Sequence, residues 1–375
     1  MQAIIKILKK PVTSTIIAIL FGFIVAGIIL AFAGYNPFKT MVVLFNGIFA
    51  RPKSLANVII KATPIILTGL SVSFAFKTGL FNIGAEGQYI IGTIASTIIG
   101  IKLNLPVIIQ VPLVVLSGLV FGAALGTIIG LLKSKFGIHE VITSIMFNWI
   151  MLYLCNFVSN LPQFHKPNTT GTYPVNQSSY TMVLYKWKTS KDGISALRNN
   201  KFLSDVLLKT DLNYGILIAL VLAFVVWFLL YRTKKGFELR AVGLNSYASE
   251  FAGISVSKNI IHAMMVAGAL SGLAGALTIT GVSPHNISTI SVFENNGFNG
   301  LSVALIAGSS PLGCILAGLL FSGLIYGGQS VQSEIGAPSE IINIMIGTIV
   351  FFIALTKIIP ILTDRLRKRA VTNAK

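Results

Sequence analysis

Apolar stretches of about 20 residues recur along this chain, and they constrain its fold more than any other feature. A helix needs about 20 apolar residues to cross the roughly 30 Å hydrocarbon layer of a bilayer. Only 11% of the 375 residues are charged, whereas soluble proteins carry about 25%. Too few charges are present to solvate the surface of a globule of this size. The sequence therefore predicts an all-α polytopic membrane protein, with one transmembrane domain over residues 1–375.

Ten windows are candidate membrane-spanning segments: 13–34, 55–76, 80–101, 105–132, 141–161, 213–231, 259–280, 299–308, 312–326 and 341–362. Eight are long enough to cross alone, whereas 299–308 is too short and 312–326 is marginal. Both of these windows are rich in Gly and flanked by polar residues, which favours broken or tilted helices. The alternative is eight crossings, with 299–326 forming a re-entrant hairpin. Both counts leave the two termini on the same side.

The basic residues predict the orientation of these segments. If the N-terminus is inside and all ten windows cross, the inner segments receive sixteen Lys and Arg and the short outer loops four. This is the asymmetry that the positive-inside rule describes, so both termini are expected in the cytoplasm. The same bias accounts for the net charge of +18. Nucleic-acid binding is not expected, because the cations lie between apolar windows rather than on one face of a soluble domain.

Two hydrophilic segments interrupt the apolar pattern. Residues 162–212 have a soluble composition and are expected to form an extracellular loop or small cap, either as a spacer between two halves or as a docking surface for an outer partner. Residues 232–258 are expected to form a cytoplasmic loop that contains a helix of about two turns, capped by Asn245 or Ser246 and stopped by Gly253. The helix either lies on lipid or contacts a cytosolic partner.

Two Gly-rich segments, 79–89 and 297–313, carry the polar residues that lie within or beside the apolar windows. Glu86 is ionisable at membrane depth, which is costly unless it faces protein or water. The segments share a Phe-Asn pair, at 81–82 and 298–299, in two halves that run in opposite directions. Paired Gly-interrupted segments in inverted repeats point to a substrate path near the middle of the membrane. The residues expected along that path are Asn82, Glu86, Gln88, Asn299 and Ser302.

Other interpretations of these segments remain open. Small-residue helix packing is the alternative to a substrate path. Glu86 either contacts the solute or braces the unwound backbone by accepting amide hydrogen bonds. A third motif, HEVITSIMFNW at 139–149, places His139 and Glu140 at the inner end of a window, where an acidic residue stabilises a helix N-terminus.

No catalytic, cofactor or metal motif stands out in the sequence. The P-loop pattern is absent and the four histidines lack metal-ligand spacing. The chain is therefore expected not to be an enzyme. Energy for uphill transport would come from another subunit or from an ion gradient.

Four strings together resemble one family: FNIGAEGQ at 81–88, HEVITSIMFNW at 139–149, GFELRAVGLNSYASEFAGI at 236–254 and GFNGLSVALIAGSSPLG at 297–313. They are similar to permease subunits of bacterial ABC importers of the branched-chain amino acid, ribose and simple-sugar class. The similarity runs from about residue 55 to 362 and is strongest to the nucleoside branch, which uses a basic-membrane-lipoprotein type of binding protein. One departure is Ser246, which stands where Pro is common.

The resemblance implies a multi-pass permease of the bacterial cell membrane that takes up nucleosides or, alternatively, simple sugars. It implies cytosolic ATPase subunits, a second permease subunit and an extracellular lipid-anchored solute-binding protein as partners, within membrane lipid. The ATPase would be contacted by residues of a coupling helix and its flanks: Gly243, Asn245, Tyr247, Phe251, Ala252 and Gly253.

A gradient-driven secondary transporter is the alternative function. Such a transporter needs membrane-embedded carboxylates that carry protons or sodium. Glu86 is the one carboxylate that the sequence places clearly within a window. The sequence therefore favours the ATP-driven importer.

Overall fold

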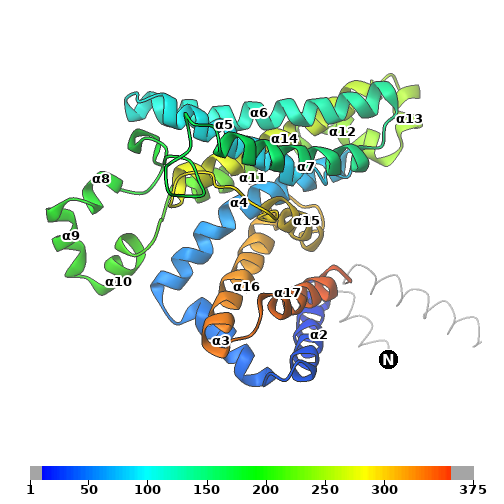
Figure 1. Ribbon diagram of the computed structural model, residues 1–375. Coiled ribbons are helices and arrows are strands. Elements are labelled where there is room, and N and C mark those ends of the chain that lie inside the picture. The colour runs from blue at the N-terminus through cyan, green and yellow to red at the C-terminus, as the bar shows by residue number, and fades with distance from the viewer. Residues whose placement is uncertain (1–10, 356–375) are drawn as a thin grey trace, which may run out of the picture. The chain divides into compact units, whose positions relative to one another are not determined.

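The computed structural model describes residues 11–355, which are helical apart from loops and isolated β-bridges (Figure 1). The chain divides into two compact units, one from Met1–Ala50 and Leu324–Lys375 and the other from Arg51–Gly323. The all-α prediction is confirmed over the described residues. The expected cytoplasmic termini, with the basic residues before 11 and after 355, lie outside them.

The described part of the first unit contains three helices and the last part of a fourth: α2 (Pro11–Phe32), α3 (Pro37–Phe49), α17 (Ser339–Ala354) and the end of α16 (Gly313–Ile335). Helix α2 packs against α17 at Gly22, where an added methyl group would lie 2.9 Å from the Cα of Ile349. Helix α3 was not predicted. It begins at Pro37 because the Asn36 side chain accepts a hydrogen bond from the Lys39 amide at 3.0 Å.

The second unit holds the long helices α4 (Pro52–Lys77), α5 (Ala85–Lys102), α6 (Val107–Phe136), α7 (Glu140–Ser159), α11 (Gly215–Arg232) and α14 (Val256–Gly281), with the short α15 (Asn296–Ile306) and the first part of α16. Helix α4 is its core, because 89% of its apolar window lies inside the protein. The corresponding share is 28% for both α6 and α11, whose outer faces are apolar. Such faces suit contact with lipid.

Helix α14 lies along α6, and the two backbones approach closely (Figure 1). A methyl group added at Gly272 would lie 2.8 Å from the Cα of Gly122. One turn further along, a methyl group added at Gly268 would lie 3.0 Å from the Cα of Gly126. This is the small-residue packing that membrane helices use to come together.

The segment between α7 and α11 is folded, as the sequence predicted for a small cap. It carries five short helical elements: η1 (Gln177–Ser179), α8 (Tyr185–Lys188), α9 (Lys191–Arg198), α10 (Lys201–Leu203) and η2 (Ser204–Leu208). Lys188 is buried, and its amino group donates to the carbonyl oxygens of Leu207 and Thr210 at 3.3 and 3.1 Å. Burial lowers the pKa of Lys188. These two hydrogen bonds join α8 to the residues at the end of the cap and so hold the cap together.

Six described helices are long and apolar enough to cross a membrane: α4, α6, α7, α11, α14 and α16. Helix α16 runs to Ile335. The apolar window 312–326 is shorter than this helix because the residues that continue the helix after 326 are largely polar. The window 299–308 contains the 11-residue α15. The window 80–101 contains α5, which begins only at Ala85 after a non-helical turn. A short helix is thus present at 299–308 as expected, whereas 312–326 lies within the continuous helix α16, and ten full crossings stay a prediction.

Candidate functional site

Glu86 holds the N-terminus of α15. Its carboxylate is fully buried and accepts hydrogen bonds from three backbone amides, those of Asn295 at 3.0 Å, Gly297 at 2.5 Å and Phe298 at 3.2 Å. The first amides of a helix lack partners within the helix, and its N-terminus favours negative charge. The two Gly-rich segments that the sequence paired are therefore in direct contact.

Two glycines permit this contact. A methyl group on Gly297 would collide with the backbone of Glu86, and one on Gly300 would lie 2.6 Å from the carbonyl carbon of Thr68. The Thr68 hydroxyl lies 2.9 Å from the carbonyl oxygen of Asn296. Helix α15 is thus fixed between α4 and α5 by backbone-to-backbone packing.

Asn82 and Gln88 form a reciprocal amide pair beside Glu86. Their side chains exchange hydrogen bonds of 2.9 and 3.2 Å, and the Asn82 amide also donates to the Ser71 hydroxyl at 3.0 Å. Ser71 donates in turn to the Ala267 carbonyl of α14 at 2.6 Å. Asn82, Gln88 and Ser71 are fully buried. The polar groups of the first segment are therefore satisfied inside the protein.

Asn148 joins the HEVITSIMFNW string to the FNIGAEGQ string. Its side chain accepts from the Gly87 amide at 2.7 Å and donates to the Ile83 carbonyl at 3.1 Å. We call the five buried residues at this contact the polar junction: Ser71, Asn82, Glu86, Gln88 and Asn148. It connects α4, α5, α7, α14 and α15.

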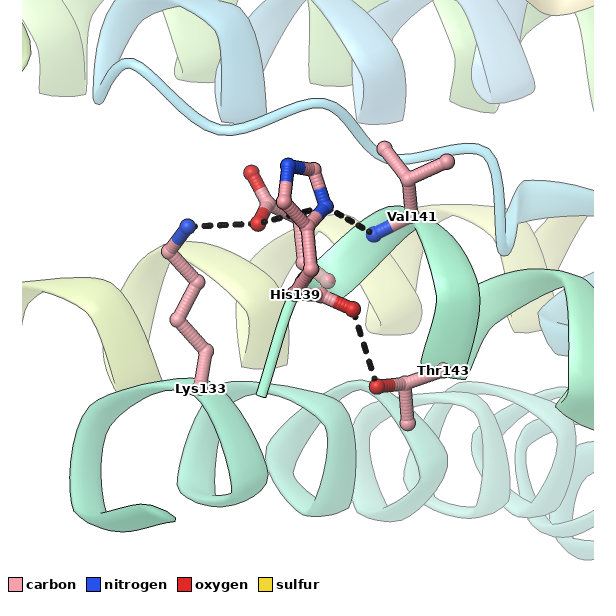
Figure 2. A network of polar contacts seen from close by, with 5 residues as sticks. Lys133, His139, Val141 and Thr143 are labelled. Carbon is pink, nitrogen blue, oxygen red and sulfur yellow. Dashed lines mark hydrogen bonds and ion pairs between the residues drawn. The ribbon is translucent and has the colours of Figure 1, made fainter. Parts of the chain in front are cut away.

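The start of α7 is held by an ion pair to α6. The Glu140 carboxylate lies 2.5 Å from the Lys133 amino group and 3.6 Å from Nδ1 of His139. Figure 2 shows how Lys133 and His139 lie at this end of the helix. The His139 ring accepts from the Val141 amide at 3.3 Å, and the Thr143 hydroxyl donates to the His139 carbonyl at 3.1 Å. His139 is thus the cap of α7, while Glu140 in its first turn pairs with Lys133.

Asn299 and Ser302 lie on the opposite face of α15 from its packed residues. The packed face carries Gly297, Gly300 and Val303, which are buried. Asn299 and Ser302 are half-buried, and neither side chain has a hydrogen-bond partner among residues 11–355. Their polar groups are available to water or to a solute.

A cavity of about 200 Å³ lies between α5, α7, α14 and the segment 282–295 that leads into α15. Its polar lining includes Tyr89, Thr93, Cys155, Thr278, Ser288 and Glu294. The Tyr89 hydroxyl donates to the Glu294 carboxylate at 3.3 Å and accepts from the Asn296 side chain at 3.0 Å. The cavity thus adjoins the polar junction through Tyr89.

The segment 282–295, which forms one wall of the cavity, is pinned on two sides. Asn156 of α7 makes two hydrogen bonds of 2.9 Å to the backbone of Ile290. The cap between α7 and α11 pairs with the segment through an antiparallel bridge between Gly171 and Ser288, with the Thr172 amide donating to the Ile287 carbonyl at 2.9 Å. The cap and the cavity wall therefore form one hydrogen-bonded structure.

The loop 232–258 folds as expected. Helix α12 (Lys234–Leu244) precedes α13 (Ser246–Phe251), which Asn245 caps by accepting from the Ala248 amide at 3.0 Å. Gly253 follows with a φ of 80°, which favours glycine. Tyr247 and Phe251 share one face of α13 and are 85% and 98% exposed. Ala252 is exposed beside them.

Gly243, at the end of α12, does not lie on the exposed face of α13. It packs against the turn between α4 and α5, where a methyl group would lie 2.9 Å from the Gly79 amide nitrogen. The loop is thereby attached to the same turn that begins the FNIGAEGQ string. Sequence reasoning had grouped Gly243 with the contact residues of α13.

Sequence reasoning missed Tyr89, Asn148, Asn156 and Glu294. Asn148 and Asn156 are polar residues at helical spacing within the window 141–161, which was a usable signal. Glu294 stands just before the short window 299–308, and its position beside Tyr89 depends on the tertiary fold. Among the described residues, no group of three or more His, Cys, Asp or Glu side chains is arranged to hold a metal ion.

Comparison with known proteins places this geometry in a family. The family model "Branched-chain amino acid transport system / permease component" matches residues 54–355. The guanosine ABC transporter permease protein NupP of Bacillus subtilis is 37% identical over 94% of this chain and 96% of its own length. The nucleoside ABC transporter permease protein NupB of Lactococcus lactis is 36% identical over 95% and 94%.

A second Bacillus subtilis protein, the guanosine ABC transporter permease protein NupQ, is 27% identical over 70% of this chain and 77% of its own length. Two guanosine permeases of one organism are thus both related to this chain. The family match covers the polar junction, the cavity and the loop 232–258. The chain therefore belongs to the branched-chain amino acid transport system permease family and is a multi-pass permease of the plasma membrane.

Proposed function

We propose that the chain is the transmembrane subunit of an ATP-binding-cassette importer for nucleosides. The observation that carries the proposal is the similarity to the guanosine and nucleoside permeases NupP and NupB, which extends over 94% and 95% of the chain. The chain itself contains no P-loop, so ATP hydrolysis falls to a separate subunit.

Helix α13 is the proposed contact with that ATPase. Two large side chains, Tyr247 and Phe251, stand almost fully exposed on a six-residue helix that is capped at both ends. Exposed aromatic residues on a well-formed helix are typical of anchors that fill a partner's pocket. Helix α12 connects this anchor to the α4–α5 turn through Gly243. Movement of the ATPase would thereby reach the start of α5.

The remaining partners are a second permease and a solute-binding protein outside the cell. A heteromeric permease pair is supported by the relationship of this chain to both NupP and NupQ of one organism. The binding protein, which we propose is lipid-anchored, would dock on the folded cap at 162–212. In this orientation both termini are cytoplasmic, and the chain makes about ten crossings in two inverted halves.

The substrate path in this proposal passes along α15. Asn299 and Ser302 face the solute, because their side chains are half-buried and unpaired within the described residues. Asn82, Glu86 and Gln88 hold the backbone of the path in place, because each is fully buried with its hydrogen bonds made inside the protein. A weak and exchangeable contact with the solute suits transport, since tight binding slows release.

Co-purification tests the proposed coupling. Phe251→Asp removes the aromatic anchor and adds a charge to a contact that must be desolvated, so we expect at least a tenfold loss of bound ATPase. The permease should reach the membrane in normal amounts, because the Phe251 side chain is almost fully exposed. Phe49→Asp, at a 63% exposed site in the first unit, is the matched control. Normal ATPase binding and uptake in Phe251→Asp would refute the assignment of α13.

A further inference from the structure

The cavity beside Tyr89 lies within one subunit, and three of its hydroxyls act as hydrogen-bond acceptors toward it. The Thr93 hydroxyl donates to the Ile90 carbonyl at 2.7 Å, and the Thr278 hydroxyl donates to the Ala274 carbonyl at 3.0 Å. The Tyr89 hydroxyl donates to Glu294. Each of these three hydroxyls has thus used its only proton and offers lone pairs to the cavity, whereas the hydroxyls of Ser283 and Ser288 and the second N–H of Asn286 can still donate.

Glu294 adds a carboxylate to this set of acceptors. The hydrogen bonds that the described residues make to it, from Tyr89 and from the Asn296 side chain, both reach Oε2. The second oxygen, Oε1, is left to accept from whatever occupies the cavity. Glu294 is exposed to the cavity mouth, whereas Tyr89 and Cys155 are buried at its floor.

The part of the cavity around Glu294 and Tyr89 therefore favours an occupant that donates hydrogen bonds and carries no negative charge. No Lys or Arg is found among the described residues that line the cavity, so nothing there would balance an anion. The volume of about 200 Å³ is below the roughly 300–1,000 Å³ of pockets that enclose drug-sized ligands. It suits a sugar ring better than a whole nucleoside.

We propose that this cavity is a solute subsite built within a single permease subunit, in which Glu294 accepts hydrogen bonds from the vicinal ribose hydroxyls of a neutral nucleoside. The inference rests on the proposed function and deepens it. Ribose enters past Ser283 and Ser288, which are exposed at the mouth, and the base stays outside the cavity. The wall formed by 282–295 connects this site to the start of α15.

The test compares guanosine with 2′,3′-dideoxyguanosine, which lacks both ribose hydroxyls, in uptake by the complete importer. Wild type should prefer guanosine, and Glu294→Gln should raise the KM for guanosine about tenfold and reduce the preference, because the charge-assisted bonds are lost. The same binding protein serves both strains, so its own preference for guanosine cancels when the two strains are compared. Glu334→Gln, the same change at an exposed carboxylate outside the cavity, should behave as wild type.

A second measurement does not depend on how Glu294→Gln folds. Both cysteines are free, and Cys155 lines the cavity while Cys314 does not. In a Cys314→Ser background, guanosine should slow the reaction of Cys155 with a small thiol reagent several-fold, and dideoxyguanosine should not. Equal reaction rates with both compounds, or an unchanged guanosine preference in Glu294→Gln, would overturn the subsite while leaving the importer intact. Absence of nucleoside uptake in wild type would instead overturn the proposed function.

Discussion

The two Gly-rich segments carry the same Phe-Asn pair, yet their polar residues differ in burial and in hydrogen bonding. Asn82, with Glu86 and Gln88, is fully buried and saturated with hydrogen bonds inside the protein. Asn299, with Ser302, is half-buried and unpaired among the described residues. A polar residue in an apolar window is therefore not by itself a sign of a solute path. A structural residue differs from a candidate solute contact in that its hydrogen bonds are already made within the protein.

The largest effect that tests this comparison is expected for Glu86→Ala. The substitution leaves the amides of Asn295, Gly297 and Phe298 without their acceptor in a buried site. Buried unsatisfied groups cost about 1–3 kcal/mol each, so the free energy of unfolding should fall by about 3–9 kcal/mol. The amount of folded permease in the membrane and its thermal unfolding in detergent would show this loss.

Glu334→Ala is the control for Glu86→Ala, because it removes an exposed carboxylate. The free energy of unfolding of Glu86→Gln should lie between those of wild type and Glu86→Ala. The amide oxygen of the new side chain still accepts a hydrogen bond, whereas its amide nitrogen cannot. A Glu86→Ala permease with wild-type thermal stability and reduced uptake would make Glu86 a solute contact and remove the distinction between the two segments.

An intermediate effect is expected for Asn82→Ala. The substitution deprives the Gln88 amide of its partner and the Ser71 hydroxyl of one donor, which should cost about 2–3 kcal/mol. The double variant Asn82→Ala with Gln88→Ala should cost less than the sum of the two single variants, because each single change already breaks the shared pair. Thermal unfolding of the four proteins measures this coupling. Additive losses would show that the pair is not a unit.

The smallest effect on stability is expected for Asn299→Ala and Ser302→Ala. Neither side chain has a partner within the described residues, so the free energy of unfolding should change by less than about 0.5 kcal/mol. Uptake should fall several-fold, because a hydrogen bond to the solute is lost. Leu305→Ala, at an exposed apolar position of the same helix, is the control and should transport normally. Wild-type uptake in both polar variants would place the path away from α15.

The helices of this protein follow largely from its sequence, because a bilayer requires long apolar segments and few other patterns satisfy it. The caps of α13 were also predictable, since Asn245 and Gly253 act on their own neighbours. Helix α3 was missed because its 13 residues are too few to cross a bilayer and Lys39 and Asn46 interrupt their apolar pattern.

The site was less predictable than the helices. The sequence identified Glu86 as ionisable at membrane depth, but the amides that it binds are more than 200 residues away. The cavity depends in the same way on Glu294 meeting Tyr89 across 205 residues. Hydrogen-bond partners of this kind are set by tertiary packing, and local sequence patterns do not contain them.

The most direct test of the account is uptake of radiolabelled guanosine, uridine and ribose by cells that lack their own nucleoside importers. The cells would express this chain with its second permease, ATPase and binding protein. The account predicts that both nucleosides accumulate and ribose does not, and that accumulation stops when the P-loop lysine of the ATPase subunit is changed to Ala. Accumulation that persists with the inactive ATPase would contradict the account and favour a gradient-driven transporter, and uptake of ribose alone would contradict the proposed substrate.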